Sequence, residues 1–211
     1  LKTPITTIMG FSELLENPKI EREKVTDFAS EINKEALRLR DIVGDIIELS
    51  SLDEGYKGEN EEINVRNAVE SEIKKLEHKA KDSCVSIENG VSSSLLINGI
   101  PKVFSEVISN LLDNAIRYNK KGGWVKVESK EMEGKVEISV SDNGIGIPKD
   151  SIERIFERFY RVDKSRSRES GGTGLGLSIV KNGMERMGGE VRVESTQGEG
   201  SIFTLTFPLN Q

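Results

Sequence analysis

The stretch that decides the fold reads SDNGIGIP and covers residues 141–148. It follows residues 136–140, where apolar and polar residues alternate, which predicts a strand. Gly144 and Gly146 flank a single apolar residue and let the backbone approach a planar ligand closely. Asp142, at the end of the predicted strand, can accept a hydrogen bond from an exocyclic amine, which adenine offers where guanine has a carbonyl. Taken alone, the segment could also be an ordinary Asp-Asn-Gly turn.

An earlier stretch, residues 110–118 (NLLDNAIRY), lies in a helix that we expect from about Pro101 to Tyr118. Asn110, Asn114 and Arg117 fall on one face of it, because residues three and four apart stack along a helix. Amide oxygens suit Mg²⁺, and a guanidinium group neutralises phosphate oxygens. The face therefore fits a metal–phosphate group, although such a face can also be merely solvated.

A glycine-rich stretch, residues 171–178 (GGTGLGLS), runs into a helical pattern at residues 179–181. Backbone N–H groups and the positive end of the helix dipole gather there, which suits phosphate. A basic run, residues 161–168, precedes it in an otherwise acidic chain. The stretch is not a Walker P-loop, because it has no Gly-Lys-Ser/Thr. A glycine-rich loop alone specifies little.

The first quarter of the chain has a helical period. Apolar residues from 25 to about 52 recur at alternating steps of four and three, which is the seam of a helical bundle. The seam consists of Val25, Ala29, Ile32, Ala36, Leu39, Val43 and Ile46, and Phe28, Ile42, Leu49 and Leu52 widen it. With a stop at residues 17–19, residues 1–52 read as a hairpin with more apolar surface than two helices cover. We expect dimerisation into a four-helix bundle; the alternative is packing on the rest of the chain.

Beyond a polar linker at residues 53–60 the period changes. A helical stripe covers residues 65–80. Short alternating stretches, which predict strands, cover residues 85–87, 95–97, 124–127, 136–140, 191–193 and 202–207. Helices with an antiparallel or mixed sheet predict an α+β fold, here an α/β sandwich.

Composition limits the class of protein. The 211 residues suffice for one large or two small domains, and 35% hydrophobic with 31% charged residues is typical of a folded globular chain. The net charge of −6 argues against nucleic-acid binding. A single cysteine, Cys84, excludes an internal disulfide, and no apolar run is long enough to cross a bilayer.

The three stretches, in this order, resemble the N, G1 and G2 boxes of the histidine kinase ATP-binding domain, in the gyrase–Hsp90–histidine kinase–MutL superfamily. Residues 155–161 (IFERFYR) resemble the F box, which separates sensor kinases from the other ATPases of that superfamily. The amino-acid sequence of residues 156–181 is most similar to the corresponding segment of phosphate-regulon and cell-wall sensor kinases. The resemblance implies a dimerisation and histidine-phosphotransfer hairpin at residues 1–54 and an ATP-binding catalytic domain at residues 60–211.

The resemblance implies ATP and Mg²⁺ as ligands and assigns roles by position in the motifs. Asn114 would be the main Mg²⁺ ligand, with Asn110 close by. Arg161 and Arg117, where the family more often has lysine, would contact phosphates. The full set expected to bind ATP is Asn110, Asn114, Arg117, Tyr118, Asp142, Gly144, Gly146, Ile147, Arg161, Gly172, Thr173, Gly174, Leu175 and Gly176. Asp142 would bind the adenine amine, and residues 163–173 would form a mobile lid.

In the family, the hairpin carries His-Glu-x-Lys/Arg-Thr-Pro, and residues 1–4 (LKTP) resemble the tail of that motif. The resemblance implies that the acceptor histidine lies just before Leu1, in a protein longer than this chain. Thr3 would orient the water that hydrolyses the phospho-aspartate of a response regulator. The only histidine, His78, falls between Leu76 and Ala80, away from the apolar stripe of its helix, so we expect it on the surface.

The implied function is that of a sensor histidine kinase core. It would bind Mg-ATP, phosphorylate a histidine and pass the phosphoryl group to an aspartate of a response-regulator receiver domain, with phosphatase activity also possible. It would be a homodimer and the cytoplasmic portion of a protein anchored in the membrane through its N-terminal region. The rivals are a regulatory pseudokinase and a clamp-type ATPase, and the F box and the hairpin disfavour the clamp.

Overall fold

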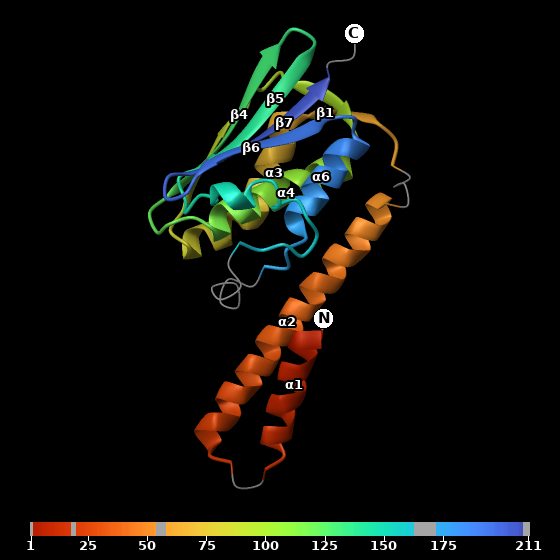
Figure 1. Ribbon diagram of the computed structural model, residues 1–211. Coiled ribbons are helices and arrows are strands. Elements are labelled where there is room, and N and C mark those ends of the chain that lie inside the picture. The colour runs from red at the N-terminus through yellow and green to blue at the C-terminus, as the bar shows by residue number, and fades with distance from the viewer. Residues whose placement is uncertain (1, 18–19, 54–57, 163–171, 209–211) are drawn as a thin grey trace.

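The structure is a computed structural model that describes residues 2–17, 20–53, 58–162 and 172–208. It has two parts, a long helical hairpin and a layer of helices packed on a sheet (Figure 1). The hairpin consists of α1 (Lys2–Leu15) and α2 (Arg22–Asp53). Phe11 and Phe28 join the two helices, with ring centroids 5.2 Å apart. The predicted helical hairpin is confirmed.

The middle of α2 and the outer side of α1 leave apolar side chains uncovered in the single chain. Val43, a predicted seam residue, is 44% exposed, and Ile5 and Met9 of α1 are exposed as well. The end of α2 differs, because Leu49 and Leu52 are buried in the core of the second part. The end of α2 therefore packs on its own chain, whereas in its middle Ile42 is buried and Val43 is exposed.

The second part is built on a mixed five-stranded sheet with the strand order β2-β4-β5-β7-β6. Its strands are β2 (Ser86–Gly90), β4 (Trp124–Met132), β5 (Lys135–Asp142), β6 (Glu190–Thr196) and β7 (Gly200–Pro208). β2 is parallel to β4, and the other neighbours are antiparallel. This confirms the predicted α+β class and mixed sheet.

A separate two-stranded ladder pairs β1 (Glu61–Asn64) with β3 (Leu96–Gly99). The sequence pattern did not predict β1, because Ile63 is the only apolar residue of that strand and no alternation of apolar and polar residues is present. Ile63 lies opposite Ile97 in the ladder, and both are buried. Pairing with β3, which is distant in the sequence, therefore stabilises β1 as a strand.

Three helices cover one face of the five-stranded sheet (Figure 1): α3 (Val65–Asp82), α4 (Pro101–Arg117) and α6 (Gly176–Arg186). A short 3₁₀ turn, η1 (Lys149–Ser151), follows β5. The core lies between the layers, where Phe104 of α4 packs against Phe207 of β7 with centroids 5.9 Å apart. None of the helices in the described ranges is long and apolar enough to cross a membrane.

The layered core gives a direct test of the fold. Leu205 of β7 is completely buried, so Leu205→Ala removes packed methyl groups and leaves a cavity. We expect a loss of about 2–5 kcal/mol in the free energy of unfolding, measured by urea denaturation. Ile202 lies in the same strand but is 43% exposed, so Ile202→Ala is the control and should cost at most about 1 kcal/mol. Equal losses in the two variants would contradict the assigned faces of β7.

Candidate functional site

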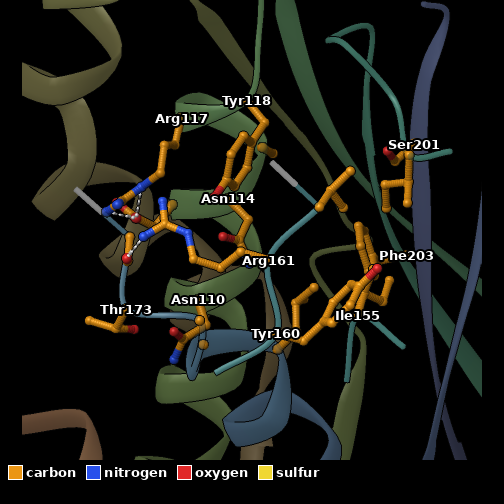
Figure 2. Close-up of a pocket in the computed structure, with 18 of the residues that line it drawn as sticks. Asn110, Asn114, Arg117, Tyr118, Ile155, Tyr160, Arg161, Thr173, Ser201 and Phe203 are labelled. Carbon is orange, nitrogen blue, oxygen red and sulfur yellow. Dashed lines mark hydrogen bonds and ion pairs between the residues drawn. The ribbon is translucent and has the colours of Figure 1, made fainter. Parts of the chain in front are cut away.

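A cavity of about 720 Å³ lies between α4, the turn after β5, residues 155–162, the start of α6 and the side of α2. Figure 2 shows its lining side chains. Of the fourteen residues expected to bind ATP, twelve line this cavity: Asn110, Asn114, Arg117, Tyr118, Asp142, Gly146, Ile147, Arg161, Gly172, Thr173, Gly174 and Gly176. Motifs that are far apart in the sequence thus meet in one place.

The α4 wall carries the polar residues that the helical spacing placed together. Asn110 Nδ2 donates a hydrogen bond to the Glu106 carbonyl at 2.9 Å, which leaves its Oδ1 directed at α6. A Cβ at Gly176 would lie 2.7 Å from that oxygen, so a larger first residue of α6 would displace the Asn110 side chain. Arg117 donates to one oxygen of Asp113 from Nε at 3.2 Å and from Nη2 at 2.8 Å, and this pair fixes its guanidinium beside the cavity.

Asp142 ends β5 with its carboxylate in the cavity wall. Burial raises the pKa of Asp142, and hydrogen bonds from the backbone N–H groups of Gly144, at 2.8 Å, and of Ser201 oppose that rise. Gly146 has φ +62°, and a Cβ there would lie 2.0 Å from the Thr196 carbonyl oxygen. The turn can therefore close against β6 only with glycine at this position.

Two of the residues expected to bind ATP lie behind the wall of the cavity rather than in it. Gly144 packs against the Tyr118 carbonyl, where a Cβ would approach to 2.4 Å, so its role in the structure is close packing. Leu175 is completely buried in the core and caps the start of α6. The sequence alone could not show that Gly144 and Leu175 lie behind the wall while their neighbours line the cavity, because all of them belong to the same motifs.

The glycine-rich loop brings two cations together. A Cβ at Gly172 would lie 3.2 Å from Arg117 Nη1 and 3.5 Å from Arg161 Nη2. Arg161 also donates a hydrogen bond to the Gly172 carbonyl (Figure 2). Burial lowers the pKa of Arg161, as do the nearby charges of Arg38 and Arg117, while Tyr118 opposes that effect. Two adjacent guanidinium groups in a partly buried pocket favour an anion.

The segment between the second and third motifs is tied to the glycine-rich loop by the backbone. Phe159 N donates to the Gly174 carbonyl at 2.8 Å, and both residues have positive φ, +63° and +78°. A Cβ at Gly174 would lie 2.9 Å from the backbone of Phe159, so glycine is required there. Tyr160, next in the chain, lines the cavity and donates to Ser151 Oγ at 3.1 Å.

Several residues that line the cavity were not among the predicted site residues. Ile155, Tyr160 and Phe203 form an apolar side of the cavity (Figure 2). The α2 helix contributes three acidic side chains, those of Asp41, Asp45 and Glu48. Their spacing of four and three residues could have shown that they share a helix face, but not that this face meets the pocket.

Glu48 of α2 shares a hydrogen bond with Glu106 of α4. Burial raises the pKa of Glu48 to about 8, with further contributions from that hydrogen bond and from the negative charges of Glu106 and Asp45. The positive charge of Lys102 opposes the rise. The Glu48 carboxyl therefore keeps its proton at neutral pH.

Two singled-out residues lie outside the cavity. Thr3 is exposed in the first turn of α1, and His78 is exposed on α3, which confirms its predicted surface position. Most of the expected lid, residues 163–171, lies outside the described residues.

Comparison with known families gives two matches. Residues 99–211 match the family described as histidine kinase-, DNA gyrase B- and HSP90-like ATPase. Residues 1–55 match the His Kinase A (phospho-acceptor) domain. A sensor-like histidine kinase, SenX3 of Mycolicibacterium smegmatis, is 38% identical over 99% of this chain and 54% of its own length. The chain therefore spans about half the length of that relative.

Two solved structures are similar along nearly the whole chain. The histidine kinase ThkA, in complex with the response regulator protein TrrA, has a TM-score of 0.77 and 26% identity, over 99% of this chain and 58% of that one. Full-length ShkA in complex with AMPPNP has a TM-score of 0.73 and 26% identity, over 98% of this chain and 43% of that one. The arrangement of hairpin and sandwich thus recurs in both.

The raised pKa of Glu48 predicts a pH dependence of stability. Below the ordinary pKa of 4.5 the carboxyl is protonated whether the chain is folded or not. Between pH 4.5 and about 8 the unfolded chain loses the proton that the folded chain keeps, so the contribution of Glu48 to stability falls as pH rises. Glu48→Gln should therefore gain stability relative to the parent chain from pH 5 to pH 8.5 in urea denaturation.

Glu23→Gln is the matched control, because Glu23 is exposed at the start of α2. It should follow the parent chain at every pH. If Glu48→Gln also follows the parent chain throughout, the pKa of Glu48 is not raised in the folded chain.

Proposed function

The chain belongs to the histidine kinase-, DNA gyrase B- and HSP90-like ATPase family, and from that premise we propose that it is the catalytic core of a sensor histidine kinase. Residues 60–211 would bind Mg-ATP, and residues 1–54 would carry the phosphotransfer hairpin. The observation that carries this proposal is the meeting of Asp142, the Asn110–Arg117 face of α4 and the glycine-rich loop around one cavity.

Asp142 would recognise the base. Its carboxylate lies in the cavity wall, and Ile147 and Phe203 supply apolar surface nearby for a planar ring. A carboxylate accepts a hydrogen bond from the adenine amine and repels the carbonyl oxygen that guanine has in its place. This end of the pocket thus suits ATP and not GTP.

The other end of the pocket would hold the phosphates. Arg117 and Arg161 converge on Gly172, and the loop then runs to Gly176, where the eleven-residue helix α6 begins. Backbone N–H groups at a helix N-terminus and guanidinium groups both stabilise phosphate oxygens.

Mg²⁺ fits the donors on α4. Asn110 and Asn114 both line the cavity, and the Nδ2 group of Asn110 is bonded to a backbone carbonyl, so its side-chain oxygen is the atom left for a cation. Oxygen is the donor that Mg²⁺ prefers. Asn114 and Asn110 would hold the ion, which would neutralise charge on the phosphate chain.

The phosphoryl group would pass from ATP to a histidine and then to an aspartate of a receiver domain. The ThkA complex with a response regulator supports that class of partner. Thr3, one turn beyond the expected acceptor, would orient the water that hydrolyses the phospho-aspartate, a task that its exposed position in α1 permits. A clamp-type ATPase is disfavoured, because residues 1–55 match a phospho-acceptor domain.

The hairpin would form a homodimer. Val25 and Val43 of the predicted seam and Met9 of α1 are exposed in the single chain. A second hairpin would cover this surface and complete a four-helix bundle. Anchoring in a membrane through residues N-terminal to this chain is part of the same proposal and rests on the resemblance to sensor kinases.

The role of Asp142 is testable by calorimetry with ATP and Mg²⁺. Asp142→Asn removes a charge-assisted hydrogen bond worth about 1.5–3 kcal/mol, so affinity should fall on the order of tenfold to a hundredfold. Asp82→Asn, at an exposed position of α3, makes the same chemical change as a control and should bind like the parent chain. Equal affinities of the parent chain for ATP and GTP would contradict the role of Asp142.

The dimer is testable by sedimentation. Val43→Glu places a charge in the proposed interface, where burial without a partner costs several kcal/mol, so the variant should be monomeric. Ser30→Glu, at an exposed position off the predicted seam, should stay dimeric. A parent chain that is monomeric at tens of micromolar, roughly the range of a modest interface, would contradict the bundle.

A further inference from the structure

One carboxylate of the hairpin lies at the proposed phosphate end of the pocket. Thr173 Oγ1, in the glycine-rich loop, donates a hydrogen bond to Asp45 Oδ2 of α2. Leu175 N donates to the same Thr173 hydroxyl at 3.2 Å. Since a hydroxyl has a single proton, Asp45 takes the only donor that this side chain has.

The charges around Asp45 resemble those that a phosphate would meet. Arg117 attracts the carboxylate, and the Thr173 hydrogen bond stabilises its charged form. Burial and the negative charges of Asp41 and Asp113 act in the opposite direction and raise the pKa of Asp45. Asp45 thus contacts the glycine-rich loop and is attracted by Arg117, both of which the proposed function assigns to the phosphate chain.

We propose that Asp45 is an autoinhibitory ligand of the pocket: α2, docked through Asp45 and Thr173, competes with the phosphates of the nucleotide, and the nucleotide releases this contact. The proposal rests on the proposed function, because the competitor is the phosphate chain of ATP. It concerns a contact between α2 and the glycine-rich loop of one chain, separate from the proposed dimer.

The rest of α2 supports competition rather than joint binding. Asp41 lies on the same side of α2 as Asp45, one turn away, and also lines the pocket, so a triphosphate would meet more than one carboxylate of α2. Leu49 and Leu52, buried in the core, hold this part of the helix in place. Because coupling is reciprocal, nucleotide weakens the α2 contact by the factor with which the contact weakens nucleotide binding.

Calorimetry with Mg-AMPPNP and with adenosine tests the competition. Asp45→Asn keeps the size of the side chain and removes its charge, so it should bind Mg-AMPPNP about fivefold tighter or more, the lower range of usual coupling between sites. Its affinity for adenosine, which has no phosphates, should not change. Asp27→Asn, at an exposed position of α2, is the matched control and should bind both ligands like the parent chain.

Equal or weaker binding of Mg-AMPPNP by Asp45→Asn, with adenosine binding intact, would overturn this proposal alone; weaker binding would mean that Asp45 helps to hold the metal. Failure of the parent chain to bind either ligand would overturn the proposed function and this proposal with it.

A second measurement needs no nucleotide. Asp45→Ala removes the acceptor of the Thr173 hydroxyl, so amide hydrogen exchange at residues 172–177 should become faster than in the parent chain. Exchange that is unchanged in Asp45→Ala would show that the contact does not hold the loop and would overturn the proposal.

Discussion

The packing of α4 against the sheet is the constraint on which the rest of the structure depends. Ile108 and Leu112 are completely buried in the core between α4 and the strands, and this fixes the rotation of the helix about its axis. The neighbouring face, with Asn110, Asn114 and Arg117, is then turned into the cavity. A rotation of α4 that turned the polar face away from the cavity would also expose the apolar face to water. The packing of the core therefore determines which side chains line the pocket.

The α2 helix serves both parts of the molecule, and its sequence changes accordingly. Val43 and Ile47 of this helix are exposed apolar side chains, whereas Leu49 and Leu52 belong to the core of the sandwich. Between these residues, Asp45 and Glu48 face the pocket. The same helix thus contributes to the core of the sandwich and to the wall of the pocket.

Local patterns predicted much of this structure, and long-range contacts account for what they missed. The helices and most strands followed from apolar spacing, and Asp142 and the glycine-rich loop followed from short motifs that the fold brings into one cavity. β1, with the single apolar residue Ile63, is made by its partner strand. The hydrogen bond between Asp45 and Thr173 joins residues that are 128 positions apart in the sequence, and a local sequence pattern cannot predict such a contact.

A crystal structure of this chain with Mg-AMPPNP would test most directly whether one pocket binds the base at Asp142 and the phosphates at the glycine-rich loop. The adenine amine should lie within hydrogen-bond distance of the Asp142 carboxylate, and phosphate oxygens should lie beside Arg117 and Thr173. Asp45 should then no longer contact Thr173. An adenine ring bound away from Asp142, or phosphates outside the loop between Gly172 and Gly176, would contradict this binding mode.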